Sequence, residues 1–339
     1  MTGLDHKLAT LNVREKFAIT KEKTQQILMS VINSGLVGGC VIISTCNRTE
    51  FYASVPKDSL FEPSKVLCNA LNRCLSDFKH FFTERTDDLA IEHLCRVASG
   101  LDSQILGDDQ IITQVREALE LSRKQRCTDS YIETMFNIAV QGAKAVKTNF
   151  ILKTLGTDSV PGKTVAKLKT ICQLAGQRAV VIGNGQMGRL VSELLIHEGV
   201  NVMVTLREYK KGVVQVPNRV STIGYNDRYK AIEQTDIVIS ATTSPHYTLC
   251  RNELTGLKQI PKIIVDLAVP RDVEPSVQEI PGIILLTIDD ISGESRTLPL
   301  DSILMIDKII GKHIEKYYRW YMYKNSSPLV VFSAGKRIL

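Results

Sequence analysis

The spacing of apolar residues divides the chain into three parts. In the first part, up to about residue 155, short strand-like runs give way to apolar residues three and four positions apart, which is typical of amphipathic helices. Thr20 is placed to cap the first of these helices, and Pro63 is tolerated in the first turn of the second. Beyond the helix after Thr20, the spacing predicts helices over residues 62–82, 88–99, 109–124 and 130–153.

The second part, about residues 160–292, contains short continuous apolar runs separated by helical patterns. The runs lie within residues 178–185, 201–206, 236–242, 262–269 and 282–288. Continuous runs of this kind are typical of strands that are buried on both faces. Their alternation with helices predicts a parallel sheet with helices on both faces.

The third part begins after Asp290 and carries one helical stripe of apolar residues. It predicts a long helix over about residues 300–324 with a basic opposite face. The stripe consists of Ile303, Ile306, Ile310, Ile314, Tyr317 and Tyr321. The aromatic residues at 317–321 could stack on nucleic-acid bases, but the helical spacing favours packing, with Tyr317 and Tyr321 on the buried face.

Composition narrows the class of protein. The 339 residues are 44% hydrophobic and 23% charged, and no apolar run reaches the roughly 18 residues of a membrane helix. The N-terminus lacks a signal-peptide pattern, so we expect a cytoplasmic protein with no membrane partner. A net charge of +6 is too small to indicate nucleic-acid binding by itself. None of the eight cysteines forms a C-x-x-C pair, so we expect no metal site and mostly reduced, buried thiols.

A glycine motif follows the first strand of the second part. It reads G-x-G-x-x-G over Gly183, Asn184, Gly185, Gln186, Met187 and Gly188, between a strand and a helix. The first glycine allows a tight turn, the second admits a pyrophosphate close to the backbone, and the third lets helix and strand approach. The motif predicts a dinucleotide site. The alternative is a glycine-rich turn that binds nothing.

The residue after the next strand bears on which dinucleotide binds. NAD sites usually carry an acidic residue there, whereas Arg207 and the lysines that follow it suit a 2′-phosphate. The sequence therefore favours NADP(H), although Glu208 keeps NAD open and Arg207 could be an ordinary surface charge.

A thiol follows the first strong β-branched run of the chain. Cys46 comes directly after Val41–Ser44 and Thr45, with Asn47 and Arg48 beside it. A nearby positive charge favours the nucleophilic thiolate, and an arginine could instead bind a carboxylate in bidentate fashion. A nucleophilic thiol together with a hydride carrier suggests thioester formation followed by reduction to an aldehyde. The alternative is one more buried cysteine.

Segments along most of the chain resemble the glutamyl-tRNA reductase family. They are residues 3–7, 13–16, 44–50, 93–103, 106–107, 110–111, 114–115, 181–183, 239–242, 244–246 and 265–272. The resemblance implies an α+β N-terminal catalytic domain over residues 1–155, a Rossmann-type doubly wound NADP-binding domain over 156–292, and a C-terminal spinal helix with a short tail over 293–339. The dimerisation domain that the family carries there is largely missing, which leaves the oligomeric state open.

The same resemblance implies roles for individual residues. Cys46 would attack the ester carbonyl of glutamyl-tRNA and release the tRNA, after which NADPH would reduce the thioester to glutamate-1-semialdehyde, with His93 as a second catalytic residue. The residues implied in substrate binding are Thr45, Asn47, Arg48, Ser103, Asp108, Asp109, Gln110 and Gln114. An aminomutase that consumes the aldehyde is a candidate partner.

Several positions depart from the family pattern. Asp108 and Asp109 replace the usual Glu-Pro, Thr113 replaces a common glycine, and residues 157–162 differ from the usual connection between the domains. These departures keep a second hypothesis open, a non-catalytic relative that binds NADPH or tRNA as a regulatory module. A third, an ordinary NADP dehydrogenase of small acids, leaves residues 44–50 without a purpose.

Overall fold

The computed structural model describes residues 1–56, 59, 61–104, 110–149, 159–207, 216–292 and 300–326. The first part of the chain contains an antiparallel sheet of four strands, β1 (Thr2–Asp5), β2 (Gly39–Ser44), β3 (Arg48–Ser54) and β4 (Thr83–Glu84), in the order β2-β3-β1-β4. Its helices are α1 (Leu11–Arg14), α2 (Lys21–Asn33), α3 (Pro63–Ala70), α4 (Leu75–Phe78), α5 (Asp87–Ala98), α6 (Gln110–Lys124) and α7 (Ser130–Asn149), with short 3₁₀ turns at Glu15–Phe17 and Lys79–Phe81.

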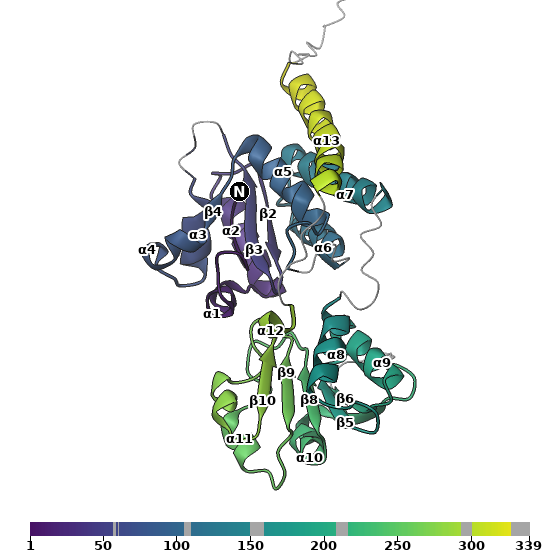
Figure 1. Ribbon diagram of the computed structural model, residues 1–339. Coiled ribbons are helices and arrows are strands. Elements are labelled where there is room, and N and C mark those ends of the chain that lie inside the picture. The colour runs from purple at the N-terminus through teal and green to yellow at the C-terminus, as the bar shows by residue number, and fades with distance from the viewer. Residues whose placement is uncertain are drawn as a thin grey trace, which may run out of the picture.

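This sheet is covered on both faces because successive strand residues point to opposite sides. Val41 and Ile43 of β2 face α5, α6 and α7, whereas Cys40 and Ile42 face α2 and α3. Both sets are buried, which explains why the sequence of β2 is continuously apolar although its sheet is antiparallel. Figure 1 shows the sheet between these two groups of helices.

The second part is a six-stranded sheet in which every described pair is parallel. Its strands are β5 (Arg178–Ile182), β6 (Asn201–Leu206), β7 (Ser221–Gly224), β8 (Ile237–Ser240), β9 (Ile263–Asp266) and β10 (Ile284–Thr287), in the order β10-β9-β8-β5-β6-β7. The helices are α8 (Val160–Ile171), α9 (Gln186–His197), α10 (Arg228–Ile232), α11 (Arg251–Thr255) and α12 (Ile288–Ser292), with 3₁₀ turns at Tyr225–Asp227 and Pro275–Glu279.

The order of these strands reverses between β5 and β8, and this defines a Rossmann-type sheet. Separate apolar clusters cover its two faces, one with α8 and α9 and the other with α10 and α11. In such sheets ligands bind beyond the carboxyl ends of the strands, at the point where the order reverses. The glycine motif after β5 lies at this point. The predicted mixed α/β fold with a doubly wound parallel sheet is thus confirmed.

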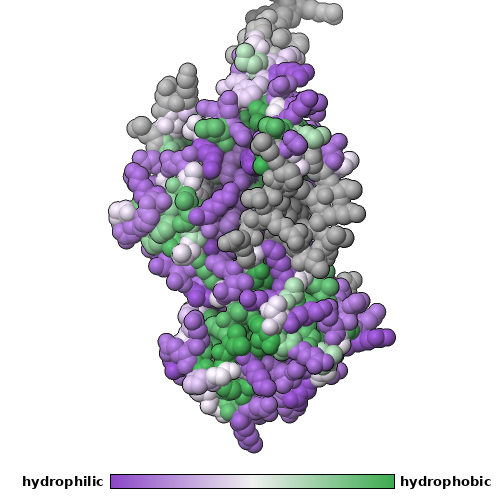
Figure 2. Space-filling model, viewed as in Figure 1, coloured by the Kyte–Doolittle hydropathy of each residue, from purple (hydrophilic) through white to green (hydrophobic). Residues whose placement is uncertain are grey.

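The last described element is α13 (Leu300–Ser326), which returns to the first part of the chain. Ile306, Ile310 and Tyr317 are buried in the same apolar cluster as α5 and α7, and Arg96 of α5 forms an ion pair with Asp307, with Nη1 and Oδ1 3.0 Å apart. Figure 1 shows α13 beside α7, at the end of the molecule away from the Rossmann sheet. Figure 2 shows that hydrophilic side chains cover much of the visible surface of both parts.

The structure confirms most predicted elements and corrects two. The single helix expected over residues 62–82 is wrong: α3 ends at Ala70, and Asn72 adopts a left-handed φ of 55° that asparagine tolerates better than most residues. Tyr321 is not on a buried face but 39% exposed, although its ring lies beside those of Tyr131 and Tyr317. Neither β7 nor α8 was predicted. The expected helix over 130–153 extends to Asn149, and residues 150–153 lie outside the described residues.

Candidate active site

Cys46 lies at the tip of the β2–β3 hairpin. The strand pairing ends at Ser44 and Thr49, and the Thr45 N–H donates to the Arg48 carbonyl oxygen over 2.9 Å, so the turn is tight. The Asn47 N–H also donates to the Thr45 hydroxyl over 3.2 Å. The thiol residue is half-buried, unlike Cys40, Cys68, Cys95 and Cys127, which are fully buried. A rigid turn therefore holds Cys46 where part of its surface is accessible.

The arginine beside this turn has its side chain in the protein core. Arg48 is 1% exposed, its Nη1 lies 2.6 Å from Oε1 of Glu50, and its Nη2 donates to the Asp102 carbonyl oxygen. Tyr52 donates to the other carboxylate oxygen of Glu50 over 2.7 Å. The sequence suggested that Arg48 would either supply a fixed positive charge to the thiol or bind a carboxylate. In the structure Glu50 balances that charge.

Glu50 is ionised because its surroundings compensate its burial. Burial raises the pKa of a carboxyl group, but the positive charge of Arg48 and the contacts with His93 and Tyr52 outweigh this and hold the pKa of Glu50 well below its ordinary value. The same carboxylate, together with burial, holds the pKa of the Tyr52 hydroxyl well above its ordinary value. The hydroxyl therefore remains a hydrogen-bond donor.

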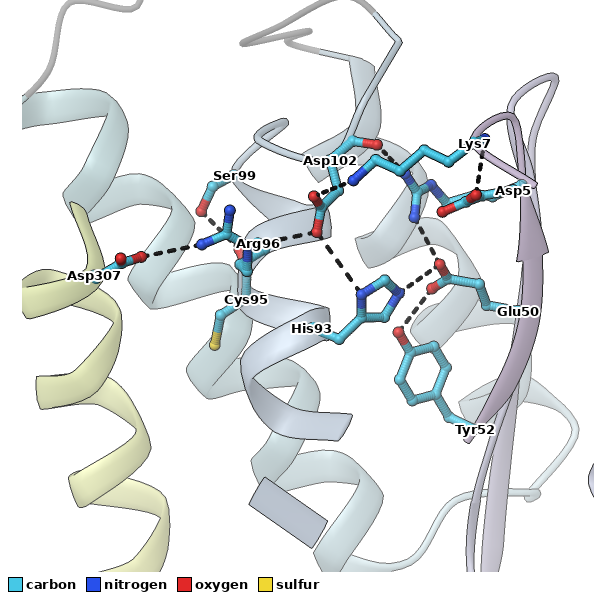
Figure 3. A network of polar contacts seen from close by, with 11 residues as sticks. Asp5, Lys7, Glu50, Tyr52, His93, Cys95, Arg96, Ser99, Asp102 and Asp307 are labelled. Atoms are coloured by element: carbon cyan, nitrogen blue, oxygen red, sulfur yellow. Dashed lines mark hydrogen bonds and ion pairs between the residues drawn. The ribbon is translucent and has the colours of Figure 1, made fainter. Parts of the chain in front are cut away.

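His93 joins this network from α5. Its Nε2 lies 2.8 Å from Oε1 of Glu50, and its Nδ1 lies 3.8 Å from Oδ2 of Asp102. Lys7 forms an ion pair with the same aspartate over 2.7 Å, and although burial raises the pKa of Asp102, the contact with Lys7 outweighs it and lowers that pKa. Figure 3 shows this network running from β3 across α5 to Asp307 of α13. It connects the hairpin, the segment at residues 102–103 and the last helix.

The other predicted substrate residues are placed as follows. Asn47 and Ser103 are buried, Thr45 is half-buried in the turn, Gln110 is the first residue of α6, and Gln114 is half-buried one turn later. Asp108 and Asp109 lie outside the described residues. Because Arg48 binds the Asp102 carbonyl, Ser103 is tied to the hairpin that carries Cys46.

The glycine turn fits a dinucleotide. Gly183 has a φ of 108°, and a Cβ atom there would lie 2.6 Å from the Ala241 carbonyl oxygen. A Cβ at Gly188 would collide with the Gly183 carbonyl oxygen, so this glycine permits helix and strand to approach. Gly185 is different, because no atom lies within 4 Å of where its Cβ would be. It is the N-cap residue directly before the twelve-residue α9, whose N-terminal N–H groups favour a phosphate.

The remaining residues of the predicted cofactor site surround this turn. Asn184 and Met187 are half-buried and Gln186 is exposed. The Gly183 N–H donates to the Thr205 hydroxyl over 3.3 Å, which fixes the end of β6 beside the turn. Arg207 follows β6, and its guanidinium carbon lies 5.3 Å from the centre of the Tyr225 ring. Arg207 is therefore positioned at the edge where a nucleotide ribose lies in this fold.

Two buried acids at the same edge were not singled out from the sequence. Asp272 accepts hydrogen bonds from the Ser240 hydroxyl over 2.7 Å and from the Thr242 N–H over 2.8 Å. Asp266 accepts backbone N–H donors, and burial raises its pKa to about 7. They tie the ends of β8 and β9 together next to the glycine turn. Only their place within residues 265–272 of the family resemblance marked them in the sequence.

The two halves of the site face each other. Asp289 follows β10 and forms an ion pair with Arg14, with Oδ1 and Nη2 2.7 Å apart, and Arg271 after β9 pairs with Glu15. Because all six strands are parallel, the glycine turn after β5 lies at this same edge. The arrangement is that of a nucleotide-dependent dehydrogenase domain whose cofactor edge faces a thiol-bearing hairpin (Figure 1).

Comparison with known proteins agrees with this arrangement. Residues 2–150 match the family model of the glutamyl-tRNAGlu reductase N-terminal domain, and residues 164–294 match that of shikimate / quinate 5-dehydrogenase. The chain is 40% identical to the glutamyl-tRNA reductases of Alkaliphilus oremlandii and Acetivibrio thermocellus, over 96% of its own length and 97% of theirs. A solved glutamyl-tRNA reductase from Methanopyrus kandleri has the same fold, with a TM-score of 0.50, 24% identity, and coverage of 95% of this chain and 80% of that one.

The chain belongs to the glutamyl-tRNA reductase family. The resemblance read from the sequence is thereby confirmed, and the non-catalytic alternative is not favoured. In the described part of the chain, no helix is both long and apolar enough to span a membrane.

Replacing Glu50 with glutamine is expected to destabilise the fold by about 3–5 kcal/mol, because it leaves Arg48 as an uncompensated buried charge. Urea unfolding at neutral pH measures this. Since the pKa of Glu50 is lowered by folding, its contribution is complete above the ordinary value of 4.5 and is lost as the pH falls below it. The difference in the free energy of unfolding between wild type and E50Q should therefore become smaller as the pH is lowered.

The matched control for E50Q is Glu198→Gln, which removes an exposed ion pair with Lys169. This variant should lose at most about 1 kcal/mol. Equal losses in the two variants would contradict the role assigned to the buried pair.

The glycines of the turn should respond differently to alanine. Gly188→Ala should destabilise the protein by about 1–3 kcal/mol, because its methyl group collides with the backbone of Gly183. Gly185→Ala should leave stability nearly unchanged and weaken dinucleotide binding, because its methyl group occupies space that a pyrophosphate needs. Thermal unfolding and NADPH fluorescence titration test the two expectations. Wild-type NADPH affinity in G185A would contradict the assigned site.

Proposed function

We propose that this chain reduces glutamyl-tRNA to glutamate-1-semialdehyde, with release of tRNA and with NADPH as the reductant, the first step of five-carbon tetrapyrrole synthesis. One observation carries the proposal: a partly accessible thiol at a hairpin tip faces the carboxyl edge of a Rossmann sheet with an intact glycine turn. Thiol nucleophiles form acyl intermediates, and the dinucleotide supplies a hydride.

The first step needs only the hairpin and the substrate. The Cys46 thiolate attacks the ester carbonyl carbon, a C–S bond forms, the C–O bond to the tRNA breaks, and the tRNA oxygen takes a proton. The resulting thioester has a carbonyl carbon that accepts a hydride. Its C–S bond then breaks, which releases the aldehyde and restores the thiolate. The net reaction consumes one NADPH and one proton.

Polar atoms beside the turn support aminoacyl binding. The buried Oδ1 of Asn47 and Nδ1 of His6 have no hydrogen-bond partner among the described residues. His6 donates its backbone N–H to the Asn47 carbonyl over 2.9 Å, so both residues lie close to Cys46. Burial lowers the pKa of His6 to about 4, and the ring is therefore neutral at pH 7. An ammonium or amide group of the substrate would satisfy such atoms.

Further polar residues complete the proposed binding site for the glutamyl group. We assign to it Thr45, Asn47, Ser103, Gln110 and Gln114, together with Asp108 and Asp109. Arg48 and His93 take part through the network that holds the hairpin and the 102–103 segment together, because their described contacts are with Glu50 and Asp102. We assign to His93, whose Nδ1 lies 3.8 Å from Oδ2 of Asp102, the exchange of a proton with a bound substrate.

Arg207 supports NADPH over NADH. It is a cation directly after β6 with an aromatic ring under its guanidinium group, a contact that limits its motion. A 2′-phosphate would form charge-assisted hydrogen bonds with it.

We also propose the division into residues 1–155, 156–292 and 293–339, a cytoplasmic location consistent with eight free thiols, and transfer of the aldehyde to an aminomutase.

Cys46→Ser should abolish NADPH oxidation driven by glutamyl-tRNA while leaving NADPH affinity unchanged. The reason is that the serine hydroxyl is a far weaker nucleophile than a thiolate at neutral pH. Absorbance of NADPH follows the reaction, with uncharged tRNA as a substrate control and Cys74→Ser, an exposed thiol elsewhere, as the matched variant. Substrate-dependent oxidation that persists in C46S would contradict the proposal.

Arg207→Gln should weaken NADPH binding by about tenfold and leave NADH binding unchanged, since only the 2′-phosphate loses a charged partner. Fluorescence titration of both nucleotides measures this. Arg189→Gln, on α9, serves as a control for loss of a positive charge near the turn. Equal weakening of both nucleotides in R207Q would show that Arg207 does not recognise the phosphate.

A further inference from the structure

Arg14 connects the thiol-bearing turn to the Rossmann sheet. It is the last residue of α1, is 3% exposed, and donates a hydrogen bond from each of its three guanidinium nitrogens. Nε donates to the Cys46 carbonyl oxygen over 3.2 Å, Nη1 donates to the Ala9 carbonyl over 3.0 Å, and Nη2 donates to Oδ1 of Asp289 over 2.7 Å. One planar group therefore contacts the backbone of the nucleophile and a carboxylate of the nucleotide-binding part.

The carboxylate partner sits at the cofactor edge. Asp289 is the second residue of α12, directly after β10, and Gln104 donates to the same oxygen over 3.4 Å. Gln104 follows Ser103 in the segment that Arg48 ties to the hairpin. Asp289 thus receives donors from two segments around the proposed substrate site.

A second ion pair lies next to the first, with the negative charge on the first part of the chain and the positive charge on the Rossmann part. Glu15 adjoins Arg14 in sequence and pairs with Arg271 of the Rossmann part, and Arg271 also donates to Asn12. Adjacent residues of the first part, one positive and one negative, therefore each pair with a residue of the opposite charge on the Rossmann part. A shift or rotation of either part would bring like charges together, so the arrangement specifies one docked position.

Arg14 links this docking to the thiol-bearing turn, because it contacts both the Cys46 carbonyl and Asp289. A buried guanidinium requires a counter-charge, and within its described contacts only Asp289 provides one. Because the donor fork is planar and rigid, loss of the carboxylate changes the orientation of Nε toward the Cys46 carbonyl. Displacement of the Rossmann part therefore alters the turn that holds the nucleophile.

We propose that Arg14 is a positioning residue that couples docking of the Rossmann sheet to the orientation of the Cys46 turn, through its ion pair with Asp289. This inference rests on the proposed function. Thioester formation depends on the orientation of the turn, whereas hydride transfer also requires the thioester carbon and the nicotinamide to be about 3–3.5 Å apart. The Arg14–Asp289 pair therefore affects the second step most.

Asp289→Asn tests the coupling, because it removes the charge but retains a side chain of nearly the same size. Hydride transfer, measured as single-turnover NADPH oxidation, should fall by up to about 100-fold, the effect of a misplacement of about 1 Å. Release of tRNA from glutamyl-tRNA without any nucleotide should also slow, but by a smaller factor, because it depends on the orientation of the turn and not on the distance to the nicotinamide. Asp289→Glu, which restores the charge, should recover most of the hydride-transfer rate.

Asp290→Asn is the matched control. It lies on the same short helix and loses the same charge, but its carboxylate accepts from Thr287 rather than from the other part of the chain. We expect wild-type hydride transfer in this variant. Slow hydride transfer in both D289N and D290N would show that damage to α12, not loss of docking, is the cause, and would overturn the proposal.

Amide hydrogen exchange on the full chain without nucleotide or tRNA gives a readout independent of activity. Exchange in Leu11–Arg14 and Ile288–Ser292 should become faster in D289N than in D290N. Unchanged exchange together with unchanged hydride transfer would overturn the coupling. A wild-type protein that oxidises no NADPH would refute the proposed function alone, and the exchange experiment would still decide whether Asp289 docks the two parts.

Discussion

The ion pair between Arg48 and Glu50 is the interaction on which the site depends. Both side chains are buried within one strand, at 1% and 2% exposure, and neither charge could remain there alone. Glu50 also binds His93 and Tyr52, and Arg48 binds the Asp102 carbonyl. The pair therefore holds the β2–β3 hairpin, α5 and the 102–103 segment in one arrangement, with Cys46 at the hairpin tip. Arg96 pairs with both Asp102 and Asp307, and so connects this arrangement to α13.

The second constraint is that two chemically different half-sites must meet. The Rossmann sheet presents its carboxyl edge, where Gly185 leaves space for a pyrophosphate, and the hairpin presents a thiol. The reciprocal ion pairs of Arg14 and Glu15 with Asp289 and Arg271 bring these edges together. In the proposed mechanism, acyl transfer occurs on one part of the chain, and reduction requires both parts to be docked.

Local patterns predicted much of this structure, and long-range contacts explain what they missed. The helix cap at Thr20, the parallel strands and the glycine turn depend on neighbouring residues, and they are confirmed. The role of Arg48 is different: adjacency to Cys46 suggested an effect on the thiol, whereas its partner Glu50 lies two positions on, on the same face of the strand. The contacts of Arg14 span 32 and 275 residues, and no spacing rule could pair them.

The central claim is that Cys46 becomes acylated, and peptide mass spectrometry tests it most directly. The protein is mixed with glutamyl-tRNA in the absence of nucleotide, quenched in acid and digested. The account predicts one added glutamyl group on the peptide containing Cys46, which disappears when NADPH is added before quenching. Release of tRNA with no adduct on Cys46, or an adduct on another cysteine, would contradict it.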